Sequence, residues 1–224
     1  MTQLYLYGIL RKKLKSEIQI YRDFFVSKLF PTFDDIEDIA NKYSEELFDT
    51  LMADSSDPNE DGASFAEDAI EHGISHYLAL ATVRHSFASI AVASLYHLWE
   101  QQAREFLFSE LSHDVHLDPA KFCANGMEDI KRIFLTHKVD LTTLKSWTLV
   151  NELRLVCNVV KHGDGKSSND LLALNPKLFN PRARTPAAGS LLEEKLLLSS
   201  TEFSKYANNL ANFWDELPER SSYP

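Results

Sequence analysis

The stretch NELRLVCNVVKHGDG, residues 151–165, decides the fold class and holds most of the functional signal of the chain. Its apolar residues recur at helical spacing. Gly163 follows the last of them, at a place where glycine commonly ends a helix. The stretch therefore predicts the end of a partly buried helix that carries a polar cluster: Arg154, Asn158, Lys161 and His162.

A helical wheel at about 100° per residue divides this helix into two faces. The apolar face consists of Leu149, Leu153, Val156 and Val160. The opposite, polar face consists of Asn151, Arg154, Asn158 and His162, together with Trp147. We expect the first face to pack in the core and the second to face solvent or another subunit. A tryptophan on the polar face favours a partner surface, because aromatic residues are enriched there.

The same periodicity predicts helices over residues 3–29, 32–52, 64–111, 127–137, 141–162 and 200–217. Pro31 ends the first helix, Thr32 caps the second and Asp140 caps the fifth. A helix over 64–111 would be roughly 70 Å long, so we expect a kink or break near Gly73. The one candidate strand, Leu191–Leu198, has a charged centre that breaks its alternation. The sequence predicts an all-α bundle of about six helices that forms a single domain over residues 1–224.

Three connections separate these helices. Residues 53–62 form an acidic segment, which we expect to be exposed, and residues 112–126 form a loop. Residues 163–190 are expected to be irregular, and loops of that length inside a domain are often functional.

The composition of the chain disfavours several classes of protein. The net charge of −10 disfavours nonspecific binding to nucleic acid. The basic patch formed by Arg11, Lys12, Lys13 and Lys15 is expected to be a solvated helix face. Cys123 and Cys157 lie among apolar residues and are expected to be buried free thiols. The charged N-terminus is unlike a signal peptide, and no apolar run approaches the roughly 18 residues of a membrane span. We therefore expect a cytoplasmic protein that does not enter the membrane.

The helix end Asn158-Val159-Val160-Lys161-His162 resembles the signature region of HEPN domains, all-α bundles widespread in prokaryotic toxin–antitoxin, defence and RNA-processing systems. The usual motif of that family is an arginine, a polar residue that is often asparagine, three more residues and a histidine. Asn158 and His162 match its second and last positions. Cys157 stands in the arginine position, and Arg154 lies one turn earlier. The resemblance covers roughly residues 64–163.

The resemblance implies metal-independent RNA cleavage without a cofactor. His162 would act as general base or acid on the ribose 2′-hydroxyl, and the product would be a cyclic phosphate. Arg154 or Lys161 would stabilise the charge that develops on the phosphate, and Asn158 would orient the site. Because two protomers of the family commonly pair these helices, we expect a homodimer or a protein complex with RNA as its substrate.

Structural alternatives remain open. His162 is also suited to cap its own helix through the free carbonyl groups next to Gly163. Arg154 could pair with Glu152 or with a neighbouring helix. In that case the chain would be a degenerate, non-catalytic module, and the same polar face would dock another protein.

Further histidines allow other readings. Asp68, His72 and His76 lie four residues apart, a spacing compatible with a metal site as well as with a solvated face. The loop residues His113, His116 and Asp118 could likewise bind a metal ion or simply face solvent. His85 and His97 are expected to be partly buried core histidines, and the nearby Arg84 and Glu100 could join them in a polar network. The segment GDGKS, residues 163–167, is not a phosphate loop because Val160 stands where a glycine is required, although Lys166 could still contact a phosphate.

Overall fold

The computed structural model describes residues 3–54, 62–163, 165–180 and 196–222. It confirms the all-α class, since 78% of these described residues are helical. The helices of the described residues are α1 (Gly8–Phe24), α2 (Ile36–Asp54), α3 (Gly62–Ser112), α4 (Met127–Thr136), α5 (Trp147–His162), α6 (Lys166–Leu174) and α7 (Ser200–Glu216).

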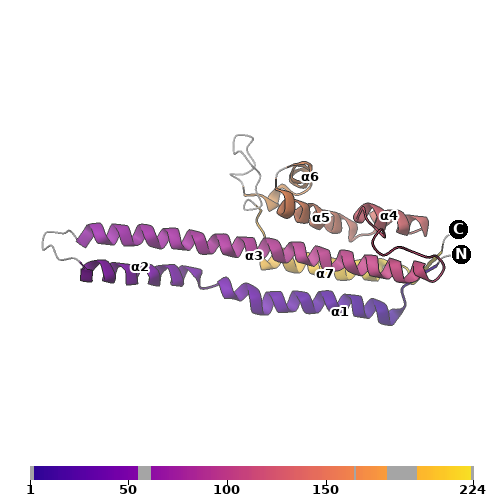
Figure 1. The fold of residues 1–224 in the computed structure, drawn as a ribbon, viewed down its shortest axis with the longest axis horizontal. Helices are drawn as coiled ribbons and strands as arrows, with labels where there is room; N and C mark the ends of the chain where they lie inside the picture. The colour runs from indigo at the N-terminus through magenta and orange to yellow at the C-terminus, as the bar shows by residue number, and fades with distance from the viewer. Residues whose placement is uncertain (1–2, 55–61, 164, 181–195, 223–224) are drawn as a thin grey trace.

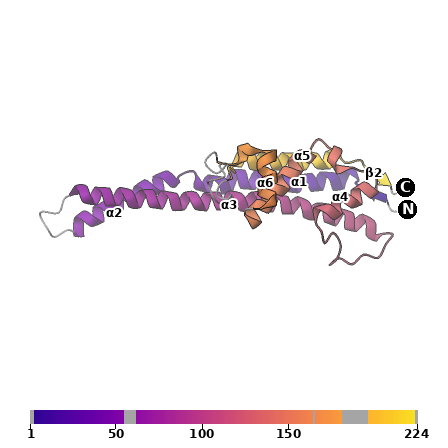
Figure 2. The same cartoon turned by 90° about the horizontal axis from the view of Figure 1, so that it is seen from above.

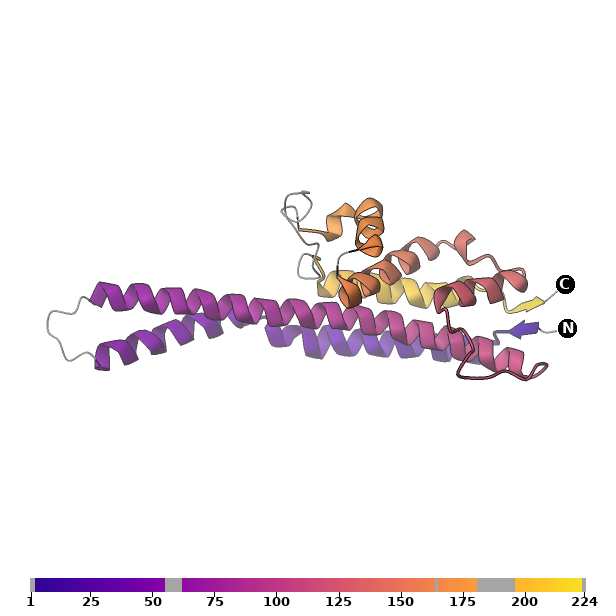
Figure 3. The same cartoon turned by 45° about the horizontal axis from the view of Figure 1, so that its top comes forward.

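Helix α3, 51 residues long, is the spine of the molecule. Figure 1 shows α1 and α2 following each other along one side of α3, and α4, α5 and α6 lying over another side. Helix α7 lies beside α3 and α1, and the view from above in Figure 2 agrees with this arrangement. Helix α2 and the first half of α3 extend beyond the other helices as a hairpin, which Figure 3 shows most clearly.

Short elements join and close the bundle. A π-helical turn, Phe25–Leu29, and a 3-10 turn, Phe30–Phe33, connect α1 to α2. Strand β1 (Gln3–Tyr5) pairs antiparallel with strand β2 (Arg220–Ser222), so the two ends of the chain meet. This small sheet was not expected from the sequence, because a three-residue strand has too few positions to show alternation.

The core lies where α3, α5 and α7 meet. Trp99, Phe213 and Trp214 are fully buried there. The predicted apolar face of α5 is confirmed: Leu153 and Val156 are fully buried, while Leu149 and Val160 are partly buried against the core.

One charged residue of α5 is also buried. The carboxylate of Glu152 accepts hydrogen bonds from the Tyr206 hydroxyl at 2.7 Å and from the Lys205 ammonium at 3.2 Å. Both partners lie on α7, so this buried polar contact fixes α5 against that helix.

The predicted break near Gly73 is wrong, because α3 is continuous over its whole length. Gly73 serves close packing instead. A Cβ atom at this position would lie 2.8 Å from the Cβ atom of Ser44 on α2, and the Ser44 hydroxyl donates to the carbonyl of Ala69 at 2.8 Å. A glycine inside a helix marks a kink or a close contact, and here it marks the contact.

Several predicted boundaries also change. The first helix begins at Gly8 and not at residue 3. Thr32 does not cap α2, since its hydroxyl donates to the carbonyl of Leu29 within the preceding turn. Asp140 caps a 3-10 turn, Leu141–Thr143, and α5 begins only at Trp147.

The connection over residues 163–190 is not irregular throughout, because it contains α6 and a 3-10 turn, Pro176–Leu178. Residues 191–195 of the candidate strand lie outside the described residues. Leu196 forms an isolated antiparallel bridge with Phe179.

By length and composition alone, α3 of the described residues is long and apolar enough to cross a bilayer. A core helix of a soluble protein passes the same test, so this property is weak evidence for a membrane protein.

Candidate functional site on the polar face of α5

The helix end that the sequence predicts is confirmed. Helix α5 ends at His162, and Gly163 adopts a φ of +67° while its N–H donates to the carbonyl of Val159 at 2.8 Å. Helix α6 follows within three residues, and its Leu171 is fully buried. The end of α5 therefore lies beside a second helix, α6.

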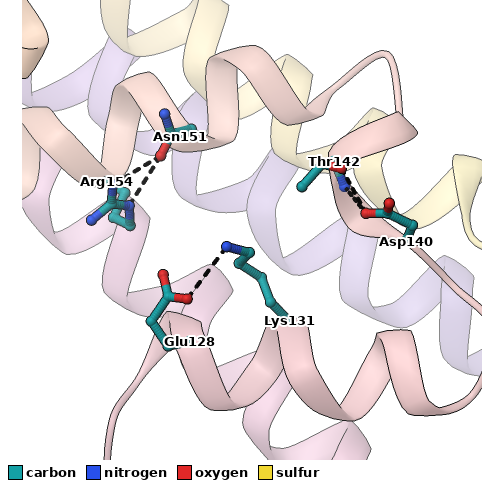
Figure 4. A network of polar contacts seen from close by, with 6 residues as sticks. All are labelled: Glu128, Lys131, Asp140, Thr142, Asn151 and Arg154. Atoms are coloured by element: carbon teal, nitrogen blue, oxygen red, sulfur yellow. Dashed lines mark hydrogen bonds and ion pairs between the residues drawn. The ribbon is translucent and has the colours of Figure 1, made fainter.

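The predicted site residues occupy one face of α5 with different exposure. Arg154 and Asn158 are half-buried, whereas Lys161 and His162 are exposed. The Arg154 guanidinium donates two hydrogen bonds, at 2.9 Å and 3.1 Å, to the amide oxygen of Asn151 one turn earlier (Figure 4). The alternative in which Arg154 pairs with Glu152 is wrong, because Glu152 faces α7.

Asn158 and His162 have different surroundings. The Asn158 amide donates a long hydrogen bond, 3.4 Å, to the hydroxyl of Ser167 in the first turn of α6. His162 makes no hydrogen bond or ion pair with any residue that the structure describes, so its imidazole faces solvent and does not bond to the carbonyl groups of its own helix. The structure places Arg154, Asn158 and His162 on one face without direct contact among their side chains.

Cys157, in the arginine position of the HEPN motif, is a core residue. It has no exposed surface, and its Sγ lies 3.7 Å from Nε2 of His97 on α3. Burial raises the pKa of the thiol to about 11, although the nearby Lys161 ammonium acts in the opposite direction. The predicted buried free thiols are confirmed for both Cys123 and Cys157.

His97 belongs to a polar network on α3, as the sequence predicted. Its Nδ1 lies 3.7 Å from the carboxylate of Glu100, which also accepts a hydrogen bond from the Tyr96 hydroxyl at 3.2 Å. Burial and the adjacent Glu100 carboxylate raise the pKa of Tyr96. The predicted membership of Arg84 is not seen: it is exposed and lines a separate groove.

The Cys157 thiol, the His97 imidazole and the Glu100 carboxylate contact one another in the sequence nucleophile, base, carboxylate that a catalytic triad has. A thiol without exposed surface and with a raised pKa is not a nucleophile, because thiolate is the reactive form. The contact between Cys157 and His97 is therefore structural.

Trp147, at the start of the polar face, is half-buried against the core. The Lys131 ammonium of α4 lies 5.9 Å from the centroid of its ring and 3.3 Å from the Glu128 carboxylate. Figure 4 shows Glu128 and Lys131 on α4 facing the Arg154 region of α5, with the Asp140–Thr142 cap to one side. Helix α4 thus covers part of the surface that Trp147 was expected to offer a partner.

The remaining candidate residues lie elsewhere. His76 stacks on Tyr43 with ring centroids 4.5 Å apart, and within the described ranges no group of three or more metal-ligating side chains is close enough to hold a metal ion. Asp68 and His72 are exposed, as are His113, His116 and Lys166. The predicted solvated basic patch is wrong in part, because Arg11 and Lys15 bind the end of α7 through the Trp214 carbonyl and the Asp215 carboxylate.

A groove of about 1090 Å³ lies between α3, the segment 175–180 and the start of α7. None of the predicted site residues lines it. The candidate site residues lie on a different surface, half-buried or exposed along α5.

Comparison of the chain with family models, with curated proteins and with solved structures finds no match, so the resemblance to HEPN domains stays a prediction.

Proposed function

We propose that the chain is a HEPN-like, metal-independent ribonuclease of a prokaryotic defence or toxin–antitoxin system. The observation that supports this most directly is the solvent-facing imidazole of His162 at the end of α5. It shares one helix face with Lys161, an exposed residue, and Arg154, a half-buried one. An acid–base group beside two cations is what RNA cleavage without a metal requires.

In the proposed reaction the ribose 2′ oxygen attacks the adjacent phosphorus. Neutral His162 takes the proton of the 2′-hydroxyl, the bond to the 5′ oxygen breaks, and that oxygen leaves with a proton. The products are a 2′,3′-cyclic phosphate and a 5′-hydroxyl end. Arg154 and Lys161 stabilise the negative charge that grows on the phosphoryl oxygens.

The proton for the leaving oxygen needs a second donor. His97 is poorly suited to this role, because its two ring nitrogens face the Cys157 thiol and the Glu100 carboxylate. A second protomer would supply another His162, so the proposal includes a homodimer in which two α5 faces meet. The exposure of Lys161 and His162 agrees with a site that is completed by a partner.

The test is cleavage of total RNA in the presence of a metal chelator. We expect cyclic-phosphate ends with the wild type and a loss of at least about 100-fold in His162→Ala, which matches the usual contribution of a general acid or base. His72→Ala removes an exposed histidine from a different surface and should cleave at the wild-type rate. A wild type that leaves RNA intact, or equal cleavage by His162→Ala, would reject the enzyme.

The composite site has its own test. A mixture of wild-type and excess His162→Ala chains should lose more activity than the fall in wild-type chains accounts for, because a mixed dimer holds only one of the two His162 imidazoles that the proposed site needs. Activity in strict proportion to the wild-type fraction, while mixed dimers form, would place all the catalytic groups in one protomer.

A non-catalytic module is the second candidate, and the burial of Cys157 favours it. The position that carries an arginine in the HEPN motif is here a core position without exposed surface. The polar face of α5 would then bind another protein. In that case Arg154→Glu, which reverses a charge on this face, weakens the complex, and neither Arg154→Glu nor His162→Ala changes RNA.

A further inference from the structure

The hairpin of α2 and the first half of α3 carries most of the charge of the chain. Residues 36–54 and 62–83 contain nine carboxylates and one lysine, a net charge of −8 within a total of −10. The lysine, Lys42, already pairs with Glu46 at 3.6 Å. This part of the molecule extends beyond the other helices (Figure 3), so the negative charge is concentrated at one end.

The same hairpin exposes large apolar side chains. On α3, Ile70, Ile74 and Leu78 are 59%, 56% and 58% exposed. They recur every four residues, so they form one stripe along the helix. Contiguous exposed apolar side chains on a soluble protein mark sites of contact with a partner.

A groove of about 330 Å³ runs between α2 and α3 beside this stripe. Its floor consists of small residues, Ala40, Ser44 and Gly73, which let the two helices approach closely. The walls differ in chemistry. Large apolar residues from α3, Ile70, Ile74 and Tyr77, form one wall, and polar residues from α2, Glu37 and Asn41, form the other.

We infer that this groove binds a cationic amphipathic helix of another protein. Such a helix places its apolar side chains against the α3 wall and its lysine or arginine side chains toward Glu37 and the other carboxylates of the hairpin. Helices that dock in grooves commonly use apolar residues at this helical spacing. Where α2 and α3 approach closely at Ser44 and Gly73, the floor consists of small residues on which the apolar side chains of the partner can rest.

The negative charge of the hairpin favours a cationic helix in the groove over a second copy of the chain. Two hairpins packed on each other would bring two clusters of net charge −8 together, and like charges across an interface oppose association. A cationic partner instead gains attraction over the whole hairpin, and this attraction falls with added salt.

The probe is a synthetic peptide of about 20 residues with leucine at every third or fourth position and lysine elsewhere, titrated into the full-length protein at low salt. One control peptide has the same composition in scrambled order, and a second has glutamate in place of lysine. We expect binding of the amphipathic lysine peptide at one site per chain, weaker binding of the scrambled peptide, and none of the glutamate peptide.

Two hairpin variants and two matched controls test the location. Ile74→Ser removes exposed apolar surface and should weaken binding by about tenfold, and Glu37→Lys should weaken it by a similar factor. Ile20→Ser on α1 removes an equally exposed isoleucine, which is 65% exposed, and Glu105→Lys reverses an exposed charge outside the hairpin. Both controls should bind as the wild type does, and all four variants should keep the helical circular dichroism of the wild type.

Equal binding by the hairpin variants and the controls would overturn the inference, as would equal binding of the scrambled peptide. A dimer of the free protein that Ile74→Ser dissociates would assign the groove to a second copy. Binding to zwitterionic lipid vesicles that Ile74→Ser abolishes would assign it to a membrane. The inference does not depend on RNA cleavage, since His162→Ala should bind the peptide normally.

Discussion

The Sγ atom of Cys157 lies 3.7 Å from Nε2 of His97, so a partly buried contact ties α5 to α3. The imidazole of His97 is held on its other side by Glu100, which Tyr96 in turn contacts. Because the polar groups of Cys157, His97 and Glu100 contact one another, they hold α5 in position against α3. Arg154 and His162 lie on the outer face of α5 and take no part in these contacts.

The first prediction concerns pH. Burial raises the pKa of Cys157 from its ordinary value of 9.0 to about 11, so folding favours the neutral thiol. The resulting stabilisation is fully present below pH 9 and is lost as the pH rises through 11, a change of about 3 kcal/mol in the free energy of unfolding. Urea unfolding at pH 8 and pH 10.5 should show a smaller loss of stability for Cys157→Ala than for the wild type. Groups other than Cys157 titrate alike in the wild type and in Cys157→Ala. Equal losses of stability between pH 8 and pH 10.5 in the two proteins would contradict the raised pKa of Cys157.

The second prediction concerns the close contact of α2 and α3. Alanine favours a helix over glycine by about 1 kcal/mol, yet Gly73→Ala should destabilise the protein by about 1–3 kcal/mol because its Cβ atom meets Ser44. Gly8→Ala, at a position with nothing within 4 Å of a new Cβ atom, serves as the control and should not destabilise. Thermal unfolding measures both. In the background of Ser44→Gly, the penalty of Gly73→Ala should largely disappear, and a penalty that persists would mean that Ser44 is not its cause.

The third prediction concerns the buried carboxylate. Glu152→Gln and Tyr206→Phe should each cost about 1–3 kcal/mol in urea unfolding, because each leaves a buried polar group poorly paired. The double variant should cost less than the sum of the two, since both remove the same contact. Tyr7→Phe, at an exposed tyrosine, should have no measurable effect. Strict additivity of Glu152→Gln and Tyr206→Phe would show that the two groups act independently.

Much of the fold follows from local sequence rules. The apolar positions of α5 and the glycine at its end, Gly163, were predictable because helical period and positive φ are properties of a short segment. Helix α6 was missed because it is only nine residues long, KSSNDLLAL, and its apolar residues stand together at its end without a visible helical period. The role of Gly73 was misjudged because the choice between a kink and a close contact depends on Ser44, nearly 30 residues away.

Part of the candidate site was predictable because helical spacing is visible within a short segment. The face that carries Arg154, Asn158 and His162 follows from their spacing of four residues. The contact of Cys157 with His97 joins residues 60 positions apart and leaves no local signal in the sequence. The acidic hairpin was visible as charge, but its groove depends on how closely α2 and α3 approach.

The most direct test of the central claim is the chemistry of the RNA ends. Total RNA incubated with the wild-type protein in a chelator should yield 2′,3′-cyclic phosphate and 5′-hydroxyl ends, and His162→Ala should yield at least about 100-fold fewer while His72→Ala yields as many. Cleavage of equal extent by wild type and His162→Ala, or intact RNA with the folded wild-type protein, would contradict the assignment of the α5 face as a ribonuclease site.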